Sequence, residues 1–591
     1  MSAETERTDR QVIAAGGGWL LGPVQPEEVR VPEELSPEQQ ALAEAAGEFV
    51  ERQVLPHMGA LEEHDQELLV ELMHQAGEQG LLGLEIPEEY GGLGLDRTGA
   101  TRVTEAVAPS GGFAVTHGAH VGIGSLPLVF FGSEEQKRRY LPRLASGEWI
   151  AAYALTEPGY GSDALHARTT ARLSEDGTSY ILNGEKQWIT NAGIADLFTV
   201  FAQLEGAGFT AFLVERGFPG VSTGPEYEKM GLRSSSTRPL ILQEARVPVE
   251  NLLGEPGKGH RVALGILDIG RLNLGAGALG SSKRLVDIAA RYALEREQFG
   301  RPIAEFGLIR EKLAEMEART WALEAMVYRT SGLIDAELRR SDATDPAKAT
   351  AEYALECAAV KVYGSEVLDY VVDEAVQIHG GYGYMREYEV ERAYRDARIN
   401  RIFEGTNEIN RLTIPDTLLR RALKGRLPLM QVLQALQQEL PRLRRPAFFD
   451  QPLEEESWRV EALKKASLMV GGLAVERYGQ ALEEEEELLG SFADMLIETY
   501  AAESALLRAR KRRASGGADA LAEAIARLTV DRAARRVRDL AGRALAALYQ
   551  GDELRLRLAL VDRLAGREPI DEIGLRRQVA QRVLEARGYV A

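Results

Sequence analysis

Cysteine is nearly absent from this sequence, which has a single one, Cys357, in 591 residues. One thiol cannot form a disulfide within the chain, so a disulfide-stapled fold is excluded and a reducing compartment is indicated. The surrounding stretch, ALECAAVKVYG, is typical of a buried helix face, and we assign the thiol no chemistry. Histidine is also scarce, with eight residues, and none has the paired spacing of a zinc site. We therefore expect no bound metal.

Several enzyme motifs and long apolar runs are missing as well. The sequence has no GxSxG nucleophile motif and no GxxxxGKS/T phosphate loop. The N-terminus is polar and then glycine-rich, without the basic start and apolar stretch of a signal peptide. No run approaches the roughly 18 to 20 apolar residues that a membrane-spanning helix needs. These absences predict a soluble protein, which we expect to be cytoplasmic.

What is present is the composition of a large globular protein. Apolar residues make up 45% and charged residues 27%, and the length allows about three to four domains. The net charge of −20 argues against broad nucleic-acid binding, but residues 501–591 carry 19 basic and 12 acidic residues, a net charge of +7. This tail either meets an acidic partner or consists of arginine-rich exposed helix faces. We favour the helix faces.

Three kinds of residue pattern follow one another along the chain. Residues 35–145 have the three- and four-residue apolar spacing of helices. The stretch RTTARLSEDGTSYILNGEKQWIT then places β-forming residues on both sides of a D-G turn, as a hairpin requires. Helical periodicity returns at residue 258, and prolines and charges near 420–455 mark a further break. We expect an N-terminal extension, a helical domain, a β domain, a helical bundle and an extra helical domain, divided as 1–34, 35–149, 150–255, 256–424 and 425–591.

The stretch GAGALG at 275–280 has the spacing of a dinucleotide-binding fingerprint. That fingerprint follows a buried strand, whereas the residues before this stretch have helical spacing. Small residues inside a helix more simply let a neighbouring helix approach closely. We therefore favour helix packing over nucleotide binding.

Two strand ends carry hydroxyl groups beside aromatic residues. YALTEPGYGSD, 153–163, runs from strand-like residues into a loop whose backbone and hydroxyl donors could approach a ring or a pyrophosphate. An ordinary β-turn is the alternative. KQWITNAG, 186–193, offers Trp188, Thr190 and Asn191 at a strand end, although a tryptophan is more often part of a core. Together the two strand ends could wall a flat heterocycle.

The stretch RIFEGTNEINR, 401–411, places a lone carboxylate, Glu404, between Phe403 and Gly405. Carboxylates are costly in apolar surroundings, and glycine lets the backbone lie where a side chain would obstruct it. An isolated E-G-T is more often a surface glutamate before a helix, since Gly, Thr and Asn suit helix entries. The other motifs decide between a functional and a surface carboxylate.

These motifs together carry a resemblance. In order and spacing, five motifs of this chain resemble those of the acyl-CoA dehydrogenase family: YALTEPGYGSD, KQWITNAG, EREQFGRPI (295–303), QIHGGYGYMREY (377–388) and RIFEGTNEI (401–409). The stretch IPEEYGGLG (86–94) looks like the N-terminal segment of that family. The similarity covers about residues 35–420. The GGGWLLGPV start and the C-terminal block look closest to the very-long-chain branch. The resemblance implies a mainly α fold with a central β domain, built as an α domain, a β-barrel and a four-helix bundle, plus an extra C-terminal helical domain.

The resemblance implies that FAD lies between the β domain and the helical bundle. The flavin side would be formed by residues of the two strand ends, namely Tyr153, Leu155, Thr156, Gly161, Ser162, Trp188, Ile189 and Thr190. The FAD of a neighbouring subunit would be reached by Arg296, Gln298, Phe299, Gln377, Gly380 and Gly381. Thr406 would meet the diphosphate near a helix start, where amide groups favour anions, and Glu408 is a weaker candidate. Shared cofactor sites imply at least a dimer.

The resemblance also gives Glu404 a role. In this family a carboxylate removes the α-proton of an acyl-CoA thioester while a hydride leaves the β-carbon for the flavin. Burial raises the pKa of a carboxylate and improves it as a general base near neutral pH. Some members place the base directly before the arginine of a segment like LDIGR, where this chain has Gly270, so the base is Glu404. The Glu404 amide would donate to the thioester oxygen, and Gly405 would keep the backbone clear. Asp268 and Arg271 match the family's substrate-side pair.

Other substrate contacts follow from the same resemblance. Ser162 would contact the CoA portion. The stretch GGFAVTHGAHVGIG, 111–124, aligns with the helix that floors the acyl pocket, where Ala114 and Gly118 share one face. Small residues there favour a deep pocket and long acyl chains, although they could instead permit helix packing. Segment 427–445 is amphipathic, and we favour a helix packed within the extra domain over peripheral membrane contact.

The sequence therefore predicts an FAD-dependent dehydrogenase that converts long-chain acyl-CoA to trans-2-enoyl-CoA in fatty acid β-oxidation and passes electrons to an electron-transfer flavoprotein. We expect a homo-oligomer, with a dimer favoured over a tetramer, and no nucleic-acid partner. The alternative is a flavoprotein of the same fold with another role. It would be an oxygenase or oxidase, or a nucleic-acid-associated relative using Arg508, Arg510, Lys511, Arg512 and Arg513. Glu404 opposes the oxygenases, which do not need that base.

Overall fold

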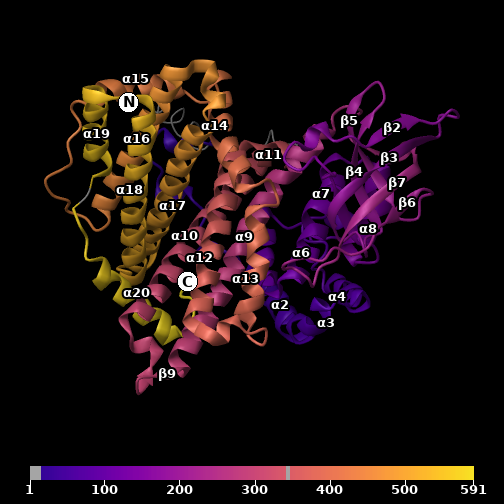
Figure 1. The fold of residues 1–591 in the computed structure, drawn as a ribbon, viewed down its shortest axis with the longest axis horizontal. Helices are drawn as coiled ribbons and strands as arrows, with labels where there is room; N and C mark the ends of the chain where they lie inside the picture. The colour runs from indigo at the N-terminus through magenta and orange to yellow at the C-terminus, as the bar shows by residue number, and fades with distance from the viewer. Residues whose placement is uncertain (1–14, 341–345, 567) are drawn as a thin grey trace.

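The computed structural model describes residues 15–340, 346–566 and 568–591. Residues 1–14 of the predicted N-terminal extension therefore lie outside the described residues. Figure 1 shows a β domain with its N-terminal helices at one end, long bundle helices in the middle and a second group of helices at the other end. The domains thus follow one another in space in the order in which the helical, β and helical patterns follow one another in the sequence.

The N-terminal helices begin at capping residues. Ser36 Oγ accepts from the Gln39 amide while the Gln39 side chain accepts from the Ser36 amide, which forms a capping box. Ser133 and Gln136 repeat this arrangement. The helices are α2 (Pro37–Phe49), α3 (Met58–Glu62), α4 (Gln66–Glu78), α5 (Arg97–Val107), α6 (Gly112–Gly118), α7 (Leu126–Phe131) and α8 (Glu134–Ser146), with a π-helical turn (Ala119–Gly124) directly after α6.

The β domain is one eight-stranded sheet. Its strands are β1 (Ala151–Ala154), β2 (Thr170–Leu173), β3 (Ser179–Thr190), β4 (Leu197–Leu204), β5 (Gly208–Glu215), β6 (Val221–Thr223), β7 (Thr237–Pro248) and β8 (Leu252–Leu253). They lie in the order β6-β7-β3-β2-β4-β5-β8, and β1 pairs with β4 in parallel. The hairpin predicted around the D-G turn is present as β2 and β3, which pair antiparallel. A hydrophobic core joins the sheet to α2, α4 and α5.

Strand β3 is irregular at its end. Its pairing with β7 shifts register between Lys186 and Ile189, and Trp188 within this shift has a φ of 58°. Such irregularities turn a side chain away from its regular face and occur beside active sites. The Trp188 indole is accordingly 58% exposed. A strained backbone thus presents an aromatic ring where the strand ends.

The bundle consists of α9 (Gly259–Glu295), α10 (Gly307–Leu338), α12 (Ala354–His379) and α14 (Asn407–Leu423), with the shorter α11 (Pro346–Glu352) and α13 (Glu389–Ala397) beside them. A small hairpin of β9 (Glu297–Gln298) and β10 (Arg301–Pro302) follows α9. GAGALG lies inside α9, so no strand precedes it. A Cβ on Gly275 would come within 2.3 Å of Val360 Cγ1, and one on Gly280 within 2.0 Å of the Glu105 carbonyl oxygen. The helix-packing interpretation is confirmed for these two glycines.

Two helical segments, Gly112–Phe131 and Gly259–Glu295, are long and apolar enough to cross a membrane by length and composition. The prediction concerned an unbroken apolar run, and polar residues interrupt both segments, so only their mean hydropathy reaches this limit. Valine, leucine, isoleucine, phenylalanine and alanine keep the mean hydropathy high even where polar residues interrupt an apolar run. Both segments are mostly buried inside the fold, as core helices are.

The last part of the chain forms the extra helical domain. Its helices are α15 (Leu429–Glu439), α16 (Glu454–Tyr478), α17 (Glu486–Gly516), α18 (Ala520–Leu548), α19 (Gly551–Ala565) and α20 (Glu572–Ala586). One continuous hydrophobic core joins this domain to the bundle and to Trp19 of the N-terminal extension. In α15, Leu429 and Leu436 are buried, as a helix packed within the domain requires.

The basic cluster at the end of α17 does not form a free surface. Arg508 is fully buried, with Nη1 2.6 Å from Glu324 Oε2 and Nε 2.9 Å from Glu33 Oε1. Lys511 lies 2.7 Å from a Glu34 carboxylate oxygen, and Arg512 also pairs with Glu33. The cluster therefore docks the N-terminal extension onto α17. The expectation of exposed helix faces was wrong here, and the feature that favoured a nucleic-acid role has internal acidic partners.

Candidate active site

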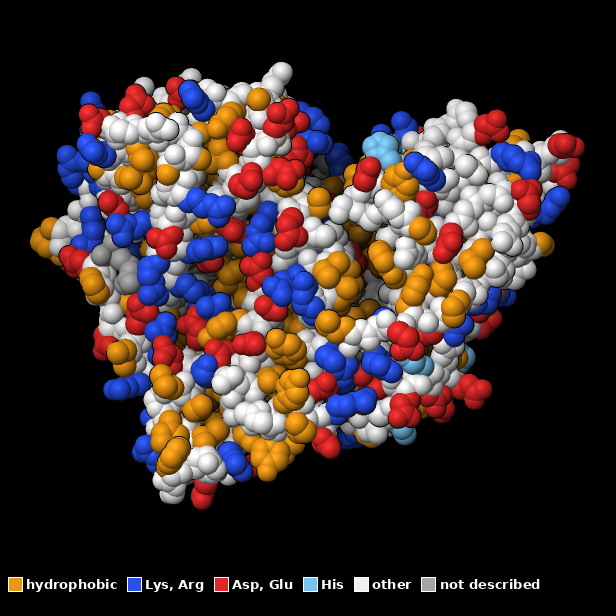
Figure 2. All heavy atoms as spheres, viewed as in Figure 1, with side chains coloured by type: hydrophobic (Ala, Val, Ile, Leu, Met, Phe, Trp, Pro, Cys, Tyr) orange, Lys and Arg blue, Asp and Glu red, His pale blue; other side chains and the backbone are white. Residues whose placement is uncertain are grey.

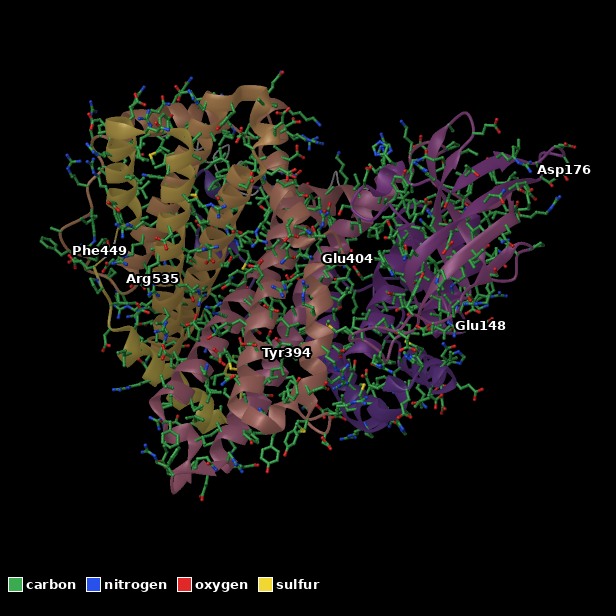
Figure 3. All side chains as sticks on the ribbon, viewed as in Figure 1. Glu148, Asp176, Tyr394, Glu404, Phe449 and Arg535 are labelled. Atoms are coloured by element: carbon green, nitrogen blue, oxygen red, sulfur yellow. The ribbon has the colours of Figure 1, made fainter. Side chains whose placement is uncertain are left out.

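Glu404 lies where the β domain meets the bundle (Figure 3), in the loop that leads into α14. Figure 2 shows the surface hollowed between these two parts. A Cβ on Gly270 of α9 would come within 2.5 Å of Glu404 Oε2. Gly270 therefore has a structural role in addition to lacking a basic side chain. Its missing side chain provides the space that the Glu404 carboxylate occupies.

The loop that carries Glu404 has an unusual backbone. Glu404 has a φ of 58° and Gly405 a φ of 77°. A non-glycine residue in the left-handed region persists only where its surroundings hold it, which is frequent at active sites. Asn410 Nδ2 of α14 donates to the Gly405 carbonyl oxygen at 2.8 Å, and Lys361 Nζ of α12 donates to the same oxygen at 2.8 Å. Arg271 Nε of α9 lies 3.5 Å from the Glu404 carbonyl oxygen. Three helices thus fix the loop.

The Glu404 carboxylate is enclosed by the protein, and nearby positive charges offset only part of the cost of burying its negative charge. The residue as a whole is half-buried, but its Oε2 atom is closed to solvent and has no hydrogen-bond partner among the described residues. Burial raises the pKa of Glu404 to about 7, against the opposing positive charges of Arg271 and Lys361. Burial likewise lowers the pKa of Lys361 to about 7. Near neutral pH the site therefore holds a carboxylate that is readily protonated and has a lone pair free for a proton from a bound molecule.

Asp268 and Arg271 form a buried ion pair on one face of α9, with 2.7 Å between Arg271 Nη1 and Asp268 Oδ1. Burial raises the pKa of Asp268, and the adjacent guanidinium opposes this rise. The pair fixes Arg271 so that its Nε faces the catalytic loop. The predicted contact of this pair with substrate stays a prediction.

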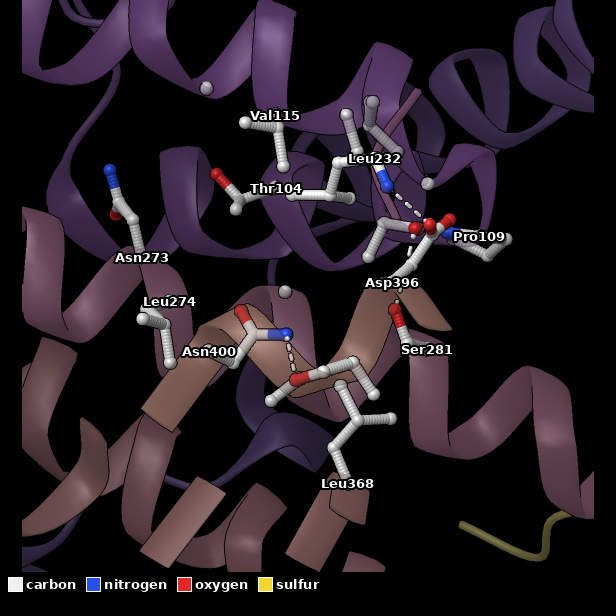
Figure 4. Close-up of a pocket in the computed structure, with 18 of the residues that line it drawn as sticks. Thr104, Pro109, Val115, Leu232, Asn273, Leu274, Ser281, Leu368, Asp396 and Asn400 are labelled. Atoms are coloured by element: carbon white, nitrogen blue, oxygen red, sulfur yellow. Dashed lines mark hydrogen bonds between the residues drawn. The ribbon is translucent and has the colours of Figure 1, made fainter. Parts of the chain in front are cut away.

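One cavity joins Glu404 to several other predicted residues. Its walls include Gly270, Thr190, Ala114 and Gly118. A Cβ on Gly118 would meet nothing within 4 Å, so this position faces open space and not a packed helix. In the close-up of Figure 4, Thr104 and Val115 lie at the upper side of the cavity, Leu368 lies opposite them, and Asn273 and Leu274 lie to the left. Ala114 and Gly118, predicted to form the floor of the acyl pocket, and Glu404, the predicted base, thus line the same cavity.

The two strand ends are also brought together. The Gln187 amide donates to the Thr156 carbonyl oxygen at 2.8 Å. Buried Lys186 donates through Nζ to the Leu155 carbonyl oxygen at 3.2 Å. These two contacts set the loop after β1 beside the end of β3, as the pairing of the two motifs predicted.

The residues around this junction form one edge of the site. Tyr153 is buried here, and burial together with the Glu404 charge raises the pKa of its phenol well above the usual range. The phenol therefore stays neutral. Its ring packs edge-on against Phe201, and its hydroxyl donates to the Ala263 carbonyl oxygen, so the predicted contact of Tyr153 with a cofactor stays a prediction. Exposed Trp188 and the cavity-lining Thr190 then offer a ring and a hydroxyl at the same edge. This arrangement fits a flat heterocycle.

The remaining predicted residues of this part differ in exposure. Ile189 is buried, so only its backbone could meet a ligand. Gly161 and Ser162 are exposed in the loop after β1. Thr406 is the N-cap of α14, where its Oγ1 accepts from the Ile409 amide at 3.2 Å, and Glu408 is exposed in the first turn. Thr406 thus caps one amide of the first turn, the Glu408 carboxylate lies in the same turn, and the contact of Thr406 with a diphosphate stays a prediction.

A second group of predicted residues lies at the end of the bundle, away from Glu404 (Figure 1, near β9). It consists of Arg296, Gln298 and Phe299 at the β9–β10 hairpin and Gln377, Gly380 and Gly381 at the end of α12. Tyr292 donates to the His379 carbonyl oxygen at 3.3 Å, which ties the two segments together. Phe299 is 93% exposed with a φ of 53°. Within one chain these residues do not reach the site, and their contact with a neighbouring subunit's cofactor stays a prediction.

Sequence reasoning missed the residues that hold the Glu404 loop, above all Lys361 and Asn410. A signal for Lys361 was present, because it is the one charged residue in the stretch CAAVKVYG. Nothing in the sequence separates Asn410 from an ordinary helix residue. Gly277, which lines the cavity, was seen only as part of a helix-packing stretch.

Comparisons with known proteins show the family to which the chain is similar. Models of the acyl-CoA dehydrogenase N-terminal, middle and C-terminal domains match residues 36–148, 152–245 and 257–419, and a further acyl-CoA dehydrogenase C-terminal domain model matches residues 462–563. A probable acyl-CoA dehydrogenase of Bacillus subtilis is 51% identical over 98% of both chains. The human mitochondrial very long-chain specific acyl-CoA dehydrogenase is 45% identical over 57% of this chain and 51% of its own length.

A crystal structure of an acyl-CoA dehydrogenase from Bacillus anthracis, described as complexed with FAD, has a TM-score of 0.96 and 50% identity. The alignment covers 98% of this chain and 100% of that one. The chain therefore belongs to the acyl-CoA dehydrogenase family. Its extra C-terminal helices are part of the same match and are not an unrelated addition.

Proposed function

We propose that this chain is an FAD-dependent dehydrogenase that converts long-chain acyl-CoA thioesters to trans-2-enoyl-CoA. The observation that carries the proposal is the Glu404 carboxylate, whose Oε2 atom is closed to solvent, lacks a hydrogen-bond partner among the described residues and faces a mostly apolar cavity. A surface glutamate before a helix would have none of these properties. Small residues at Ala114 and Gly118 support a deep cavity and hence a long acyl chain.

Different residues of this chain would carry different parts of the proposed dehydrogenation. Glu404 takes the α-proton of the bound thioester, and its raised pKa makes it a stronger base than an exposed glutamate. The Glu404 amide, in a loop fixed by Lys361 and Asn410, is available to the thioester oxygen on which negative charge develops. Bound FAD would accept the hydride that leaves the β-carbon. The apolar walls align the acyl chain and exclude water from the reacting carbons.

The β domain supplies residues that would hold the flavin. Trp188 would lie against the ring, since its indole is exposed at a strained position, and Thr190 would donate from the wall of the same cavity. Leu155 and Thr156 would lie on the facing loop. The exposed hairpin around Phe299 supports a homodimer in which each subunit contributes to the other's cofactor site. We propose an electron-transfer flavoprotein as the electron acceptor and the cytoplasm as the location.

The proposed reaction is tested by mixing the FAD-loaded protein anaerobically with palmitoyl-CoA and following flavin absorbance. Rapid bleaching with formation of trans-2-hexadecenoyl-CoA is the expected result. Persistent oxidised flavin with acyl-CoAs of every length would refute the proposal. Bleaching by a nitroalkane in place of acyl-CoA would favour an oxidase of the same fold.

The rate of flavin bleaching at low palmitoyl-CoA concentration is expected to rise with pH through about 7. The pKa of Glu404 is about 7, and only the deprotonated carboxylate can accept the α-proton, so activity is lost as pH falls below this value. Arg271 and Lys361 face the same carboxylate, and deprotonation of Lys361 near the same pH would broaden the transition. A stopped-flow series from about pH 5.5 to about pH 9 measures the profile. A rate that is independent of pH over this range would contradict Glu404 as the base.

A further inference from the structure

The cavity-lining residues of α9 form one continuous stripe. They recur at three- and four-residue intervals, which places them on one helix face, and they include Gly270, Asn273, Gly277, Ser281 and Arg284. A second stripe, on α13 and the residues after it, lines the same cavity with Glu389, Arg392, Asp396 and Asn400. The cavity is therefore a channel between two helical walls.

Contacts at both ends fix how the two walls are aligned. At one end Gly270 lies beside the Glu404 carboxylate. At the other end Arg284 Nε and Nη2 are each 3.2 Å from the Glu389 carboxylate oxygens. An α-helix rises about 1.5 Å per residue, so the roughly 14 residues from Gly270 to Arg284 span about 21 Å. The channel thus runs from the base to an ion pair at its far end.

This length can be compared with an acyl chain. Extended chains advance about 3.3 to 3.6 Å per three bonds, or about 1.2 Å per carbon. Gly277 lies about seven residues beyond Gly270, or about 10 Å, and is therefore level with about the tenth carbon of a bound chain. Ser281, at about 16 Å, is level with the end of a palmitoyl chain. An octanoyl chain would end before Gly277, whereas a palmitoyl chain would pass it.

Gly277 differs from the two glycines on either side of it. Gly275 and Gly280 allow α12 and α5 to approach, since a Cβ on either would collide with Val360 or with the Glu105 carbonyl oxygen. A Cβ on Gly277 would meet nothing within 4 Å. Packing therefore does not require a glycine there, and the space in front of it belongs to the channel.

We infer that Gly277 determines which acyl chains the site admits, because its missing side chain keeps the channel open beyond about the tenth carbon. The inference rests on the proposed function and extends it to a particular residue. It assigns the middle glycine of GAGALG a role that is neither nucleotide binding nor helix packing. The ion pair of Arg284 with Glu389 closes the far end and sets the upper limit of chain length.

The test compares the parent protein with Gly277→Leu in anaerobic flavin reduction by octanoyl-, dodecanoyl- and palmitoyl-CoA. The ratio of kcat/KM for palmitoyl-CoA to that for octanoyl-CoA is expected to fall about 100-fold. The leucine side chain would fill the space that several methylene groups of the palmitoyl chain occupy. Gly277→Ala adds one methyl group and is expected to give a smaller fall in the same direction. Gly490→Leu is the matched control, because Gly490 is also a helical glycine whose Cβ would meet nothing within 4 Å. The control is expected to keep the parent ratio.

A binding titration of the oxidised proteins with octanoyl- and palmitoyl-CoA, with thermal unfolding alongside, gives a readout independent of turnover. Palmitoyl-CoA affinity is expected to fall relative to octanoyl-CoA in Gly277→Leu, with no loss of Tm. Unchanged ratios in a folded Gly277→Leu protein, while the parent still bleaches, would overturn the channel inference and leave the proposed function standing. Absence of bleaching in the parent would refute the proposed function, and the binding ratio would then still decide the inference.

Discussion

Replacing Glu404 with glutamine is expected to lower the rate of flavin reduction by palmitoyl-CoA about 10³-fold or more, within the range that a positioned general base contributes. Glutamine keeps the size of the side chain but cannot take the α-proton. The loop should keep its shape, because Lys361 and Asn410 hold its backbone and not the carboxylate. Anaerobic stopped-flow absorbance measures the rate, and the flavin spectrum and acyl-CoA affinity report whether the site is otherwise intact.

Asp416→Asn is the control for this change, since Asp416 is an exposed carboxylate further along α14 that pairs only with Arg420 at the surface among the contacts of the described residues. It is expected to alter the rate less than about threefold. A Glu404→Gln protein that bleaches as fast as the control would remove Glu404 from the reaction. The double variant Gly270→Glu with Glu404→Gly tests the geometry further. A carboxylate from position 270 would enter the space that Glu404 leaves, and partial recovery of activity is expected.

Arg508→Met is expected to destabilise the docking of the extra domain by about 3 to 5 kcal/mol, the usual cost of leaving a buried charge without its partner. Arg508 is fully buried, pairs with Glu324 and Glu33, and lies over the Trp321 ring at 4.2 Å. Methionine fills part of the volume but leaves the Glu324 carboxylate with one cation fewer. Urea unfolding followed by circular dichroism should show an earlier transition, which need not be two-state in a chain of this size.

Arg555→Met is the matched control for the buried arginine. Arg555 pairs with Asp552 on the surface, where both side chains are almost fully exposed. Exposed ion pairs contribute little, so the unfolding midpoint is expected to stay close to that of the parent. If Arg508→Met and Arg555→Met shifted the midpoint equally, the buried network would not be a determinant of domain docking.

Much of the fold and the loop that carries Glu404 could be predicted because the relevant signals are local, although the role of Glu404 came from the resemblance of several motifs together and not from E-G-T alone. Helical spacing, the D-G hairpin and the E-G-T loop are each visible within a few residues of sequence. The surroundings of Glu404 were less accessible. Arg271 and Lys361 meet the loop across 133 and 44 positions of sequence, and only the packing of α9 and α12 brings them there. The same holds for Gly277, whose sequence neighbours suggest packing while its side faces the channel.

The incorrect prediction for the basic cluster on α17 has a physical cause. The cluster was interpreted by composition, but its charges find partners in Glu33 and Glu34 near the opposite end of the chain. Long-range pairing is not encoded in any short window.

The pairing of the N-terminal extension with α17 has a consequence for biosynthesis. Glu33 reaches Arg508 across 475 positions, and Lys464 donates to the Gly22 carbonyl oxygen across 442. A ribosome releases the N-terminus first, yet the partners of this segment are made only when most of the chain has been translated. Glu33 and Gly22 are therefore translated long before the residues that hold them in their native place. Until then Trp19 and the acidic residues near it stay solvent-exposed, available to chaperones or to a second nascent chain.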